Sequence, residues 1–452
     1  MIDQKIFKAY DVRGVYPEEI NEDVAYKIGW AFVEFLKNNN ELGSRQIIVG
    51  RDARLSSDAL FEALSQGIIS QGIDVIDLGY VSTPLLYWAV INEGVDGGII
   101  ITASHNPAQY NGFKFCGLSA KPIGLGSGLE KVRDLALGKE EIPVSFSAGK
   151  ISQKRLLDEY INSIQKQTDL SQLKPLEIII DCGNGMMGPE VEMLIKKLPC
   201  RAEILFSEPD GNFPNHEANP IKEETLETLK EKVLSEKANL GIAFDGDGDR
   251  IGFLDERGEK IRGDFITAII AQELLKENRG QKILYEVRSS KAVRETIEKS
   301  GGIPVLGRAG HALIKDQMRK EDIFFAGELS GHYFFKQLGI IDNALFAMLL
   351  VLKIISQEDK PISEIVKPFQ KYYQSGEINF EVENKEEILK SLEEKYSSAD
   401  KILKIDGLTA EFKDWWFNVR PSNTEPLLRL NIEAESEDLL EEKTKELKSL
   451  FL

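Results

Sequence analysis

The residues best suited to chemistry are three aspartates in the segment FDGDGDRIGF, residues 244–253. Asp245, Asp247 and Asp249 alternate with two glycines, which allow the backbone to turn so that the carboxylates converge. Carboxylates this close repel one another, so a folded chain rarely keeps them together without a cation. Hard oxygen ligands suit Mg²⁺ or Ca²⁺. The spacing therefore predicts a catalytic Mg²⁺ site.

Two other interpretations of the aspartate segment stay open. Asp245, Asp247, Asp249 and Glu256 fit positions one, three, five and twelve of an EF-hand Ca²⁺ loop. Arg250, however, stands at position six, where the sharp turn needs glycine. The flanking segments 238–244 and 250–254 are typical of strands rather than helices. A non-catalytic Ca²⁺-binding loop and a plain solvated acidic turn are the alternatives.

A second candidate lies in IIITASHNPAQYNGFK, residues 99–114, where an apolar strand runs into a polar loop. We expect Ser104, at the end of this strand, to be exposed and able to act as a nucleophile or carry a phosphoryl group. His105 and Lys114 are candidate proton shuttles or phosphate clamps. A plain turn would explain the same residue types. The chain has no G-x-S-x-G elbow, which argues against a hydrolase triad.

Two further polar segments stand between predicted strands. In NVRPSNTEPLLRL, residues 418–430, a guanidinium is followed by hydroxyls and an amide, which together make a good phosphate cradle. In AGELSGHYFF, residues 326–335, an acid, a hydroxyl and an imidazole alternate, so we expect all three on one side of a strand, where they could bind sugar hydroxyls. A polar hairpin and a half-buried strand are the respective alternatives. The residues concerned are Arg420, Ser422, Asn423 and Thr424 in the first segment and Glu328, Ser330 and His332 in the second.

A glycine pattern after another predicted strand resembles a dinucleotide fingerprint. Gly183, Gly185 and Gly188 form G-x-G-x-x-G, and Glu208 follows about 20 residues on. Nothing else in the chain indicates hydride chemistry. We therefore expect a tight strand-to-helix turn and keep an NAD-binding oxidoreductase as the alternative.

The elements that must position these residues alternate between strand and helix. Strand, helix and strand succeed one another over residues 45–79, again over 176–206 and again over 281–306. This rhythm indicates α/β sheets and a duplicated unit of about 100 residues. From about residue 366 the pattern becomes α+β, with helices expected over 378–396 and 437–451 and strands over 414–420 and 427–433.

Composition restricts the class of protein. The 452 residues carry 74 acidic and 56 basic side chains, so the formal net charge is −18, which argues against a nucleic-acid or anionic-membrane surface. No apolar stretch is long enough to span a membrane, and the first residues lack the apolar region of a secretory signal. Three cysteines without a CxxC pair fit a reducing compartment. We expect a cytoplasmic protein.

Taken together and in order, five motifs resemble those of the α-D-phosphohexomutase superfamily, most closely its phosphomannomutase/phosphoglucomutase group. They are FKAYDVRG, TASHNP, DGDGDR, GELSGH and RPSNTEP, and the resemblance runs from Phe7 to about Ala434. It implies three duplicated mixed α/β domains and a smaller C-terminal α+β domain, similar to the TATA-binding protein, around a central cleft. The implied boundaries are residues 1–150 with the phosphoserine loop, 151–255 with the metal loop, 256–365 with the sugar-specificity loop and 366–452 with the phosphate-binding loop.

The resemblance also implies roles for single residues. Ser104 would be the phosphoserine, and one of its phosphate oxygens would join the three aspartates as a Mg²⁺ ligand. Lys114 is the expected general acid/base, with His105 and His311 as alternatives. Arg288 stands where some relatives carry Lys, which argues against proton transfer there because Arg does not readily deprotonate. Arg250 completes the catalytic set, and the implied substrate-binding residues are Tyr10, Arg13, Arg288, Glu328, Ser330, His332, Arg420, Ser422, Asn423 and Thr424.

The implied reaction is a reversible phosphoryl transfer between positions 1 and 6 of a hexose, through a hexose 1,6-bisphosphate that serves as activator and intermediate. Phosphoglucosamine mutases typically have Gln where Leu329 stands, and glucose-restricted enzymes tend to lack the equivalent of His332. We therefore expect activity on both mannose and glucose phosphates, with phosphoglucosamine mutase as the alternative. The expected partners are sugar phosphates only, without nucleic acid or membrane, and the expected state is a monomer or homodimer.

Overall fold

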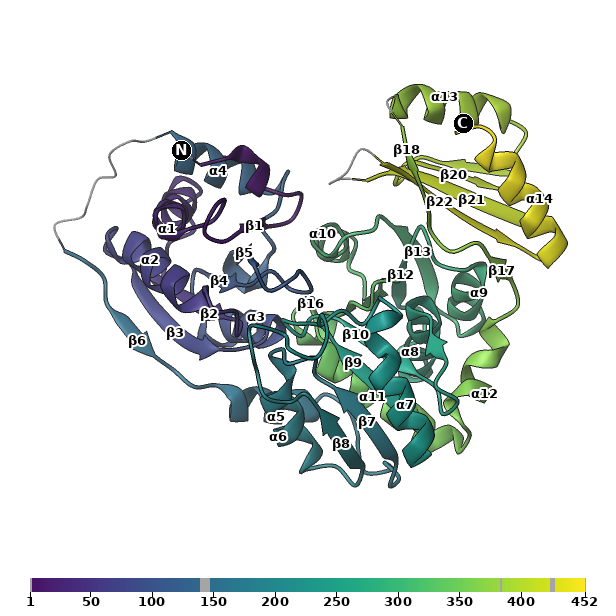
Figure 1. Ribbon diagram of the computed structural model, residues 1–452, viewed down its shortest axis with the longest axis horizontal. Coiled ribbons are helices and arrows are strands. Elements are labelled where there is room, and N and C mark those ends of the chain that lie inside the picture. The colour runs from purple at the N-terminus through teal and green to yellow at the C-terminus, as the bar shows by residue number, and fades with distance from the viewer. Residues whose placement is uncertain (1, 139–146, 383, 423–426, 452) are drawn as a thin grey trace. The chain divides into compact units, whose positions relative to one another are not determined.

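The computed structural model describes residues 2–138, 147–382, 384–422 and 427–451. The chain divides into two compact units (Figure 1). Unit 1 comprises Met1–Ile261 and Ser330–Ser363, and unit 2 comprises Arg262–Leu329 and Glu364–Leu452.

The first sheet of unit 1 has the strand order β1-β5-β4-β2-β3-β6. Its strands are β1 (Val12–Val15), β2 (Gln46–Arg51), β3 (Asp74–Tyr80), β4 (Gly97–Ile101), β5 (Tyr110–Cys116) and β6 (Ile151–Gln153). Strands β4, β2, β3 and β6 are parallel, whereas β5 pairs antiparallel with both β4 and β1. Every residue of β4 is buried, as expected for a central strand with helices on both faces of the sheet.

Helices cover this sheet and end at recognisable signals. The helices and 3₁₀ turns here are η1 (Gln4–Ile6), α1 (Glu22–Asn38), α2 (Ser57–Ile69), α3 (Thr83–Glu93), η2 (Leu118–Ala120) and α4 (Leu129–Leu137). One hydrophobic core joins α1, α2 and α4 to β2 and β4. Asn21 caps α1 through the Val24 N–H, and Ser82 caps α3 through the Leu85 N–H. Gly72, two residues after the C-cap Ser70 of α2, has a φ of +73°.

The second sheet of unit 1 holds the aspartate segment and has the order β11-β10-β9-β7-β8. Its strands are β7 (Glu177–Asp181), β8 (Arg201–Leu205), β9 (Leu240–Phe244), β10 (Ile251–Leu254) and β11 (Lys260–Ile261), and its helices are α5 (Leu157–Gln165), α6 (Met187–Ile195), η3 (Glu224–Leu226) and α7 (Glu227–Glu236). Strands β9 and β10 form an antiparallel pair around residues 245–250. The prediction that strands flank this loop is therefore confirmed, and the EF-hand interpretation is wrong.

The glycine pattern after β7 serves packing between backbones. Gly183 has a φ of +53°. A Cβ at Gly185 would lie 2.8 Å from the backbone of Gly246, and one at Gly188 would lie 1.7 Å from the Ser207 carbonyl oxygen. Protein backbone thus occupies the space beside these glycines, and the predicted tight turn is confirmed.

The later segment of unit 1 is mainly one apolar helix. It contains β15 (Tyr333–Phe335), η4 (Lys336–Leu338), β16 (Ile341–Asp342) and α11 (Ala344–Glu358). Strands β15 and β16 pair antiparallel. Helix α11 is buried around most of its circumference, which is typical of a helix inside a core.

Unit 2 begins with a three-stranded parallel arrangement in the order β13-β12-β14. Its elements are α8 (Gly263–Glu277), β12 (Lys282–Glu286), α9 (Lys291–Lys299), β13 (Ile303–Gly307), α10 (His311–Glu321) and β14 (Phe325–Gly327). In unit 1, β3-β2-β4 and β8-β7-β9 have the same order, in which the first strand lies between the second and the third. The predicted duplication is therefore confirmed.

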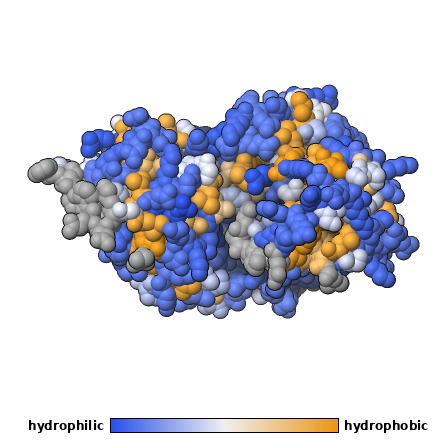
Figure 2. All heavy atoms as spheres, turned by 90° about the horizontal axis from the view of Figure 1, so that it is seen from above, coloured by the Kyte–Doolittle hydropathy of each residue, from blue (hydrophilic) through white to orange (hydrophobic). Residues whose placement is uncertain are grey.

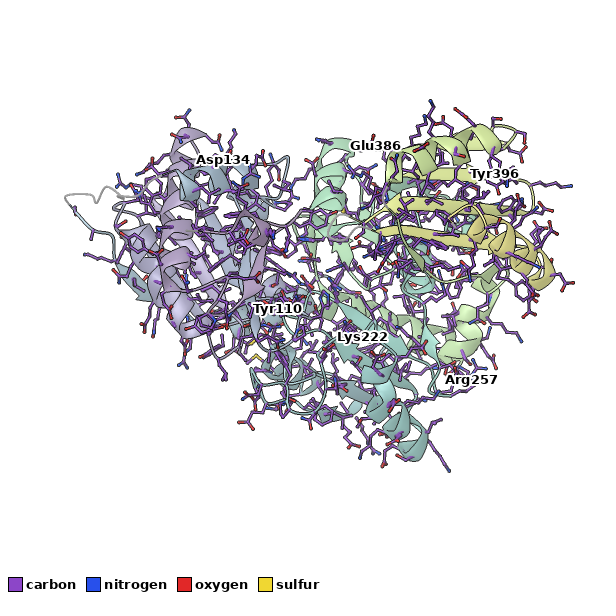
Figure 3. All side chains as sticks on the ribbon, turned by 45° about the horizontal axis from the view of Figure 1, so that its top comes forward. Tyr110, Asp134, Lys222, Arg257, Glu386 and Tyr396 are labelled. Atoms are coloured by element: carbon purple, nitrogen blue, oxygen red, sulfur yellow. The ribbon has the colours of Figure 1, made fainter. Side chains whose placement is uncertain are left out.

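The C-terminal part of unit 2 is an antiparallel sheet in the order β17-β22-β21-β20-β19, with β18 also paired to β22. Its elements are α12 (Ile362–Val366), η5 (Lys367–Phe369), β17 (Tyr373–Gln374), β18 (Ile378–Glu381), α13 (Lys385–Lys395), β19 (Lys401–Leu403), β20 (Leu408–Glu411), β21 (Trp415–Pro421), β22 (Leu427–Ala434) and α14 (Glu437–Lys448), of which the first residues of α12 belong to unit 1. The expectation of a helix over 378–396 is wrong at its start, because 378–381 pair with β22. Tyr396, labelled in Figure 3, packs edge-on against Phe417, with the two ring centroids 4.9 Å apart.

The surface agrees with the hydrophilic composition. Figure 2 shows a face on which hydrophilic side chains predominate and hydrophobic ones form small patches. Among the described residues, we find no helix with both the length and the apolar character needed to cross a membrane.

Candidate active site

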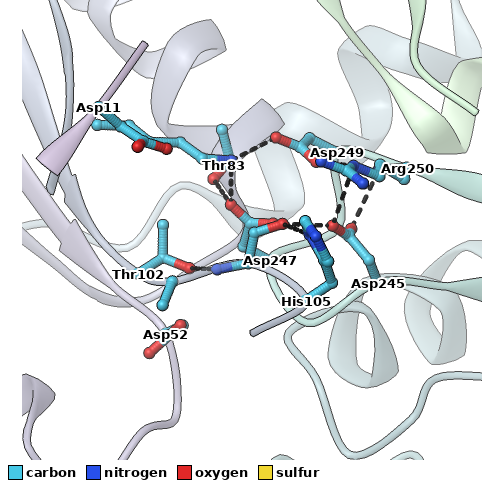
Figure 4. Close-up of polar contacts among 12 residues, drawn as sticks. Asp11, Asp52, Thr83, Thr102, His105, Asp245, Asp247, Asp249 and Arg250 are labelled. Atoms are coloured by element: carbon cyan, nitrogen blue, oxygen red, sulfur yellow. Dashed lines mark hydrogen bonds and ion pairs between the residues drawn. The ribbon is translucent and has the colours of Figure 1, made fainter. Parts of the chain in front are cut away.

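Ser104 lies in the loop after β4 and is fully buried, so the expectation that it is exposed is wrong. Its φ is +50°, a left-handed conformation that costs free energy for a residue with a side chain. Its N–H donates to Thr102 Oγ1 at 2.8 Å. Its hydroxyl donates to Asp245 Oδ2 at 2.7 Å and lies 3.1 Å from His105 Nδ1. Asp245 and His105 are labelled in Figure 4. The hydroxyl is therefore held against a carboxylate of the metal loop.

A buried arginine that the sequence analysis did not single out holds this loop. Arg54 donates to the carbonyl oxygens of Ser104 at 2.8 Å, Asn106 and Pro107 at 2.6 Å and Tyr110 at 2.9 Å. Its side chain is 0% exposed, and its Nε lies 3.1 Å from an oxygen of Asp52. Burial outweighs this partner and lowers the pKa of Arg54 below its ordinary value. One side chain thus fixes the backbone that carries Ser104 in its strained conformation.

Arg13 also contacts the Ser104 loop. From β1 it donates to the Ala103 carbonyl at 3.2 Å and to Asn106 Oδ1 at 2.8 Å, while its Nε binds Asp11 at 2.9 Å. Tyr10 lies in the bend before β1 and is partly exposed.

The three aspartates of the loop between β9 and β10 form a buried cluster. One carboxylate oxygen from each of Asp245, Asp247 and Asp249 lies within 4.8 Å of the others. Lys114 Nζ, on β5, donates to Asp247 Oδ2 at 2.6 Å and to Asp249 Oδ2 at 2.5 Å. Within the described part of the chain, the buried Asp247 Oδ1 accepts no hydrogen bond. Oxygen ligands with a free buried acceptor fit a divalent cation, so the cluster is a candidate metal site.

Charges in the cluster shift pKa values in opposite directions. Burial, reinforced by Asp249 and Asp247, raises the pKa of Asp245 well above its ordinary value. Burial alone would raise the pKa of Asp249 too, but Lys114 and His332 outweigh it and hold that pKa well below its usual range. Burial would lower the pKa of Lys114, and the two carboxylates that it contacts raise it instead.

His105 is held neutral by its surroundings. The nearby Arg250 guanidinium, burial and Arg13 together lower the pKa of His105 well below its ordinary value. A neutral imidazole has one ring nitrogen that can accept a hydrogen bond or a proton. Its Nδ1 is the atom close to Ser104 Oγ.

Arg250, Ser330 and His332 form a chain of contacts behind the aspartates. Arg250 Nε donates to His332 Nε2 at 3.2 Å, and the same ring nitrogen lies 3.3 Å from Asp249 Oδ1. Ser330 Oγ lies 3.0 Å from His332 Nδ1. The expected alternation of 328, 330 and 332 along a strand is wrong, because these residues form a turn between β14 and β15.

Thr83 also contacts the aspartate cluster, and sequence reasoning missed it. At the start of α3, its hydroxyl donates to Asp247 Oδ2 at 2.6 Å and its N–H donates to the Asp247 carbonyl at 2.9 Å. Ser82 and Pro84 mark a helix start in the sequence. That signal locates the helix but says nothing of the carboxylate it meets.

Unit 2 holds a second polar cluster. Arg288 Nε binds Glu286 at 2.8 Å, and Arg288 Nη2 lies 3.8 Å from Glu328 Oε1. Glu328 Oε1 also accepts the Gly310 N–H at 2.8 Å, immediately before His311 at the start of α10.

The predicted phosphate cradle lies at the end of β21, also in unit 2. Arg420 Nη2 donates to Glu377 Oε2 at 2.9 Å, and Arg429 Nη2 donates to Ser422 Oγ at 3.3 Å. Asn423 and Thr424 lie outside the described residues.

The predicted residues therefore gather in two sets. Unit 1 brings together Arg13, Ser104, His105, Lys114, Asp245, Asp247, Asp249, Arg250, Ser330 and His332. Unit 2 holds Arg288, His311, Glu328, Arg420 and Ser422. Ser330 and His332 thus fall in a different unit from Glu328, with which they were expected to share a strand face.

Comparison with known families identifies the family of the chain. Four successive family models match nearly the whole chain: phosphoglucomutase/phosphomannomutase alpha/beta/alpha domains I, II and III over residues 4–132, 158–258 and 262–372, and the C-terminal domain over residues 377–449. The chain belongs to the phosphoglucomutase/phosphomannomutase family.

Individual members of the phosphoglucomutase/phosphomannomutase family are similar over their full length. The phosphomannomutase of Escherichia coli (strain K12) is 39% identical over 454 residues, with 98% of each chain covered. That of Methanocaldococcus jannaschii is also 39% identical, covering 99% of this chain and 98% of the relative. A crystal structure of a phosphoglucomutase/phosphomannomutase family protein from Burkholderia thailandensis has a TM-score of 0.91 at 34% identity, covering 100% of this chain and 97% of the other. The chain is accordingly an enzyme of the phosphomannomutase/phosphoglucomutase type, an isomerase that acts by phosphoryl transfer.

Proposed function

We propose that the enzyme moves a phosphoryl group reversibly between positions 1 and 6 of mannose and glucose phosphates, through phosphoserine 104 and a hexose 1,6-bisphosphate. The observation that carries this proposal is the 2.7 Å hydrogen bond from Ser104 Oγ to Asp245 Oδ2. It joins a serine on a strained, tightly held loop to a carboxylate cluster suited to a divalent cation. Phosphoryl transfer needs this combination of a positioned donor and nearby positive charge.

In the proposed step, a sugar hydroxyl oxygen attacks the phosphorus of phosphoserine 104. The bond between phosphorus and Ser104 Oγ breaks as the bond to the sugar oxygen forms. The hydroxyl proton of the sugar passes to a base, and Ser104 Oγ takes up a proton from a general acid. The bisphosphate then returns its other phosphoryl group to Ser104 Oγ by the reverse process. Asp245, Asp247, Asp249 and a phosphoserine oxygen would hold Mg²⁺, which supplies positive charge against the charge that develops on the transferred group.

Lys114 is the proposed general acid/base, with His105 and His311 as alternatives. The contacts of Lys114 with Asp247 and Asp249 raise its pKa and keep it protonated, which favours the acid role in this arrangement. His105 has a lowered pKa and lies beside Ser104 Oγ, so it is the side chain best placed to receive a proton near the serine. Arg250, with its guanidinium within 4.0 Å of Asp245 and Asp249, adds positive charge.

We propose that the phosphate cradle of unit 2, together with the neighbouring Arg288, binds the phosphate that is not reacting. Arg420, Ser422 and Arg288 offer guanidinium and hydroxyl groups for it, and Asn423 and Thr424 are predicted to join them. Glu328 would accept hydrogen bonds from sugar hydroxyls. Through its contacts with Arg250 and Asp249, His332 would also orient the aspartate loop.

A ³¹P NMR time course tests the proposed reaction. Purified enzyme is mixed with Mg²⁺, a trace of glucose 1,6-bisphosphate and either mannose 1-phosphate or glucose 1-phosphate. Conversion of both to 6-phosphates, and loss of both activities in Ser104→Ala, is the expected result. Conversion of glucose 1-phosphate alone would refute dual specificity. Glucosamine 1-phosphate is offered in a third sample, and its conversion alone would identify a phosphoglucosamine mutase.

A further inference from the structure

Among the described residues of unit 2, three arginines converge on one carboxylate, that of Glu377. Arg420 Nη2 lies 2.9 Å from Oε2, Arg429 Nη1 lies 3.1 Å from Oε1 and Arg288 Nη1 lies 3.7 Å from Oε2. Glu377 precedes β18, whereas the arginines come from the segment after β12 and from β21 and β22. The tertiary fold therefore builds a multivalent anion site and places an anion of the chain itself in it.

The charges show what this carboxylate does to the site. Besides Glu377, Arg288 contacts Glu286 and Glu328, so the cluster of three arginines is balanced by three carboxylates. Burial would raise the pKa of Glu377, but Arg420, Arg288 and Arg429 lower it below its ordinary value, so the group is anionic at neutral pH. A phosphate bound to the same guanidinium groups would have to share them with this negative charge.

The cluster also retains hydrogen-bonding capacity for a second anion. The Arg420 side chain is only 8% exposed. Its buried Nε has no hydrogen-bond partner in the described part of the chain. The 26% exposed side chain of Glu377 can move away from the arginines into solvent, which the more deeply buried Arg420 cannot do.

We propose that Glu377 is an internal competitor for the phosphate site: its carboxylate occupies the guanidinium groups of Arg288, Arg420 and Arg429 between binding events and weakens their hold on a sugar phosphate. This inference rests on the proposed function, in which the non-reacting phosphate must leave the site within each cycle so that the other phosphate can replace it. A site with three uncompensated arginines would hold a dianion too tightly for that exchange. Glu377 supplies an anion that takes the arginines back when the phosphate departs.

The test replaces the charge of Glu377 and measures phosphate binding without turnover. Glu377→Gln keeps the size of the side chain and removes its charge. The matched control is Glu381→Gln, which lies on the same segment but is exposed and, among the described residues, contacts no arginine. The dissociation constant of inorganic phosphate is measured by isothermal titration calorimetry for the wild type and both variants. We expect Glu377→Gln to tighten phosphate binding about tenfold and Glu381→Gln to leave it unchanged.

A kinetic readout separates competition from a purely supporting role. Under competition, Glu377→Gln lowers the KM for sugar phosphate and lowers kcat, because release becomes slow. If Glu377 served only to orient the arginines, the same variant would weaken phosphate binding and raise KM, and that result would overturn the proposal, as would unchanged binding. Glu377→Asp keeps the charge but holds it farther from the arginines on a shorter side chain, so it should give an intermediate dissociation constant. This variant replaces Glu377→Gln if the latter does not fold.

The two proposals can fail separately. If the wild type does not interconvert hexose phosphates but Glu377→Gln still tightens binding of inorganic phosphate, the proposed function fails while the competition for the anion site stands. If the wild type is an active mutase and Glu377→Gln binds phosphate no more tightly, only the role of Glu377 is refuted.

Discussion

Replacing Gly246 by Ala should separate the serine loop from the metal loop. A Cβ at position 246 would lie 2.6 Å from the Ser104 carbonyl oxygen, whereas ordinary contact begins at 3.4 Å, so the two backbones must part by about 0.8 Å. Neither side yields easily, because Arg54 holds the Ser104 carbonyl at 2.8 Å and the Gly246 carbonyl accepts the Met186 N–H at 3.0 Å.

The size of this displacement sets the expected loss of activity. A separation of about 0.8 Å would lengthen the 2.7 Å contact between Ser104 and Asp245 beyond hydrogen-bonding distance. Misplacement of reacting groups by about 1 Å costs roughly 100-fold in rate. We therefore expect kcat to fall about 30-fold to 100-fold, or about 2 to 3 kcal/mol in the activation free energy.

The assay is the initial rate of 6-phosphate formation from mannose 1-phosphate at saturating Mg²⁺ and glucose 1,6-bisphosphate. The thermal midpoint is measured alongside, because overpacking alone destabilises by about 1 to 3 kcal/mol. Gly43→Ala is the control, since a Cβ there would lie 3.7 Å from Asp96 Oδ1, in ordinary contact. A folded Gly246→Ala enzyme with a kcat within threefold of the wild type would refute the reasoning.

Three other perturbations follow from the contacts described. Thr83→Val removes the hydroxyl that binds Asp247 Oδ2, so the apparent Mg²⁺ dissociation constant from activity titrations should rise about tenfold or more. Thr83→Ser keeps a hydroxyl and should restore the wild-type constant, whereas an unchanged constant in the Val variant would contradict the prediction. Arg54→Lys keeps a charge but cannot reach all the carbonyl oxygens that Arg54 binds. The free energy of unfolding measured in urea should therefore fall by about 2 kcal/mol or more, and kcat should also fall. Burial raises the pKa of Glu190 to about 7, against 4.5 for the free group. The folded state therefore holds a proton that the unfolded state has lost. The contribution of Glu190 to stability should be complete below pH 4.5 and fall by up to about 3 kcal/mol as the pH rises to about 7. Glu190→Gln should abolish that part of the pH dependence in urea titrations between pH 5 and 8, and a fall of the same size in the variant would assign it to another group.

Local sequence correctly predicted that the three aspartates converge, because the determinants of that convergence are local. Asp245, Asp247 and Asp249 lie within five residues between two apolar strands, and pairing of β9 with β10 is enough to bring their carboxylates together. The alternation of strand and helix likewise predicted the repeated α/β order, since it depends on hydrophobic period and on caps.

Sequence reasoning failed where a neighbouring element decides the local conformation. Residues 328–332 form a turn although their alternating pattern is typical of a strand. Gly331 has a φ of +90°, and a Cβ there would lie 2.5 Å from the Ile251 carbonyl oxygen, so close packing against β10 determines this turn. Residues 378–381 were expected to be helical, yet they form β18 because β22 offers an edge for pairing.

The sequence by itself determined which residue types meet in short loops: the aspartates, the serine after an apolar strand and the arginine of the cradle. Only the tertiary structure decided that Ser104 is buried and hydrogen-bonded to Asp245, 141 residues away. It also decided that Arg54 holds the Ser104 loop and that Glu377 lies among the arginines. The physical reason is that hydrophobic periodicity acts over a few residues, whereas hydrogen bonds between loops depend on how whole sheets and helices pack.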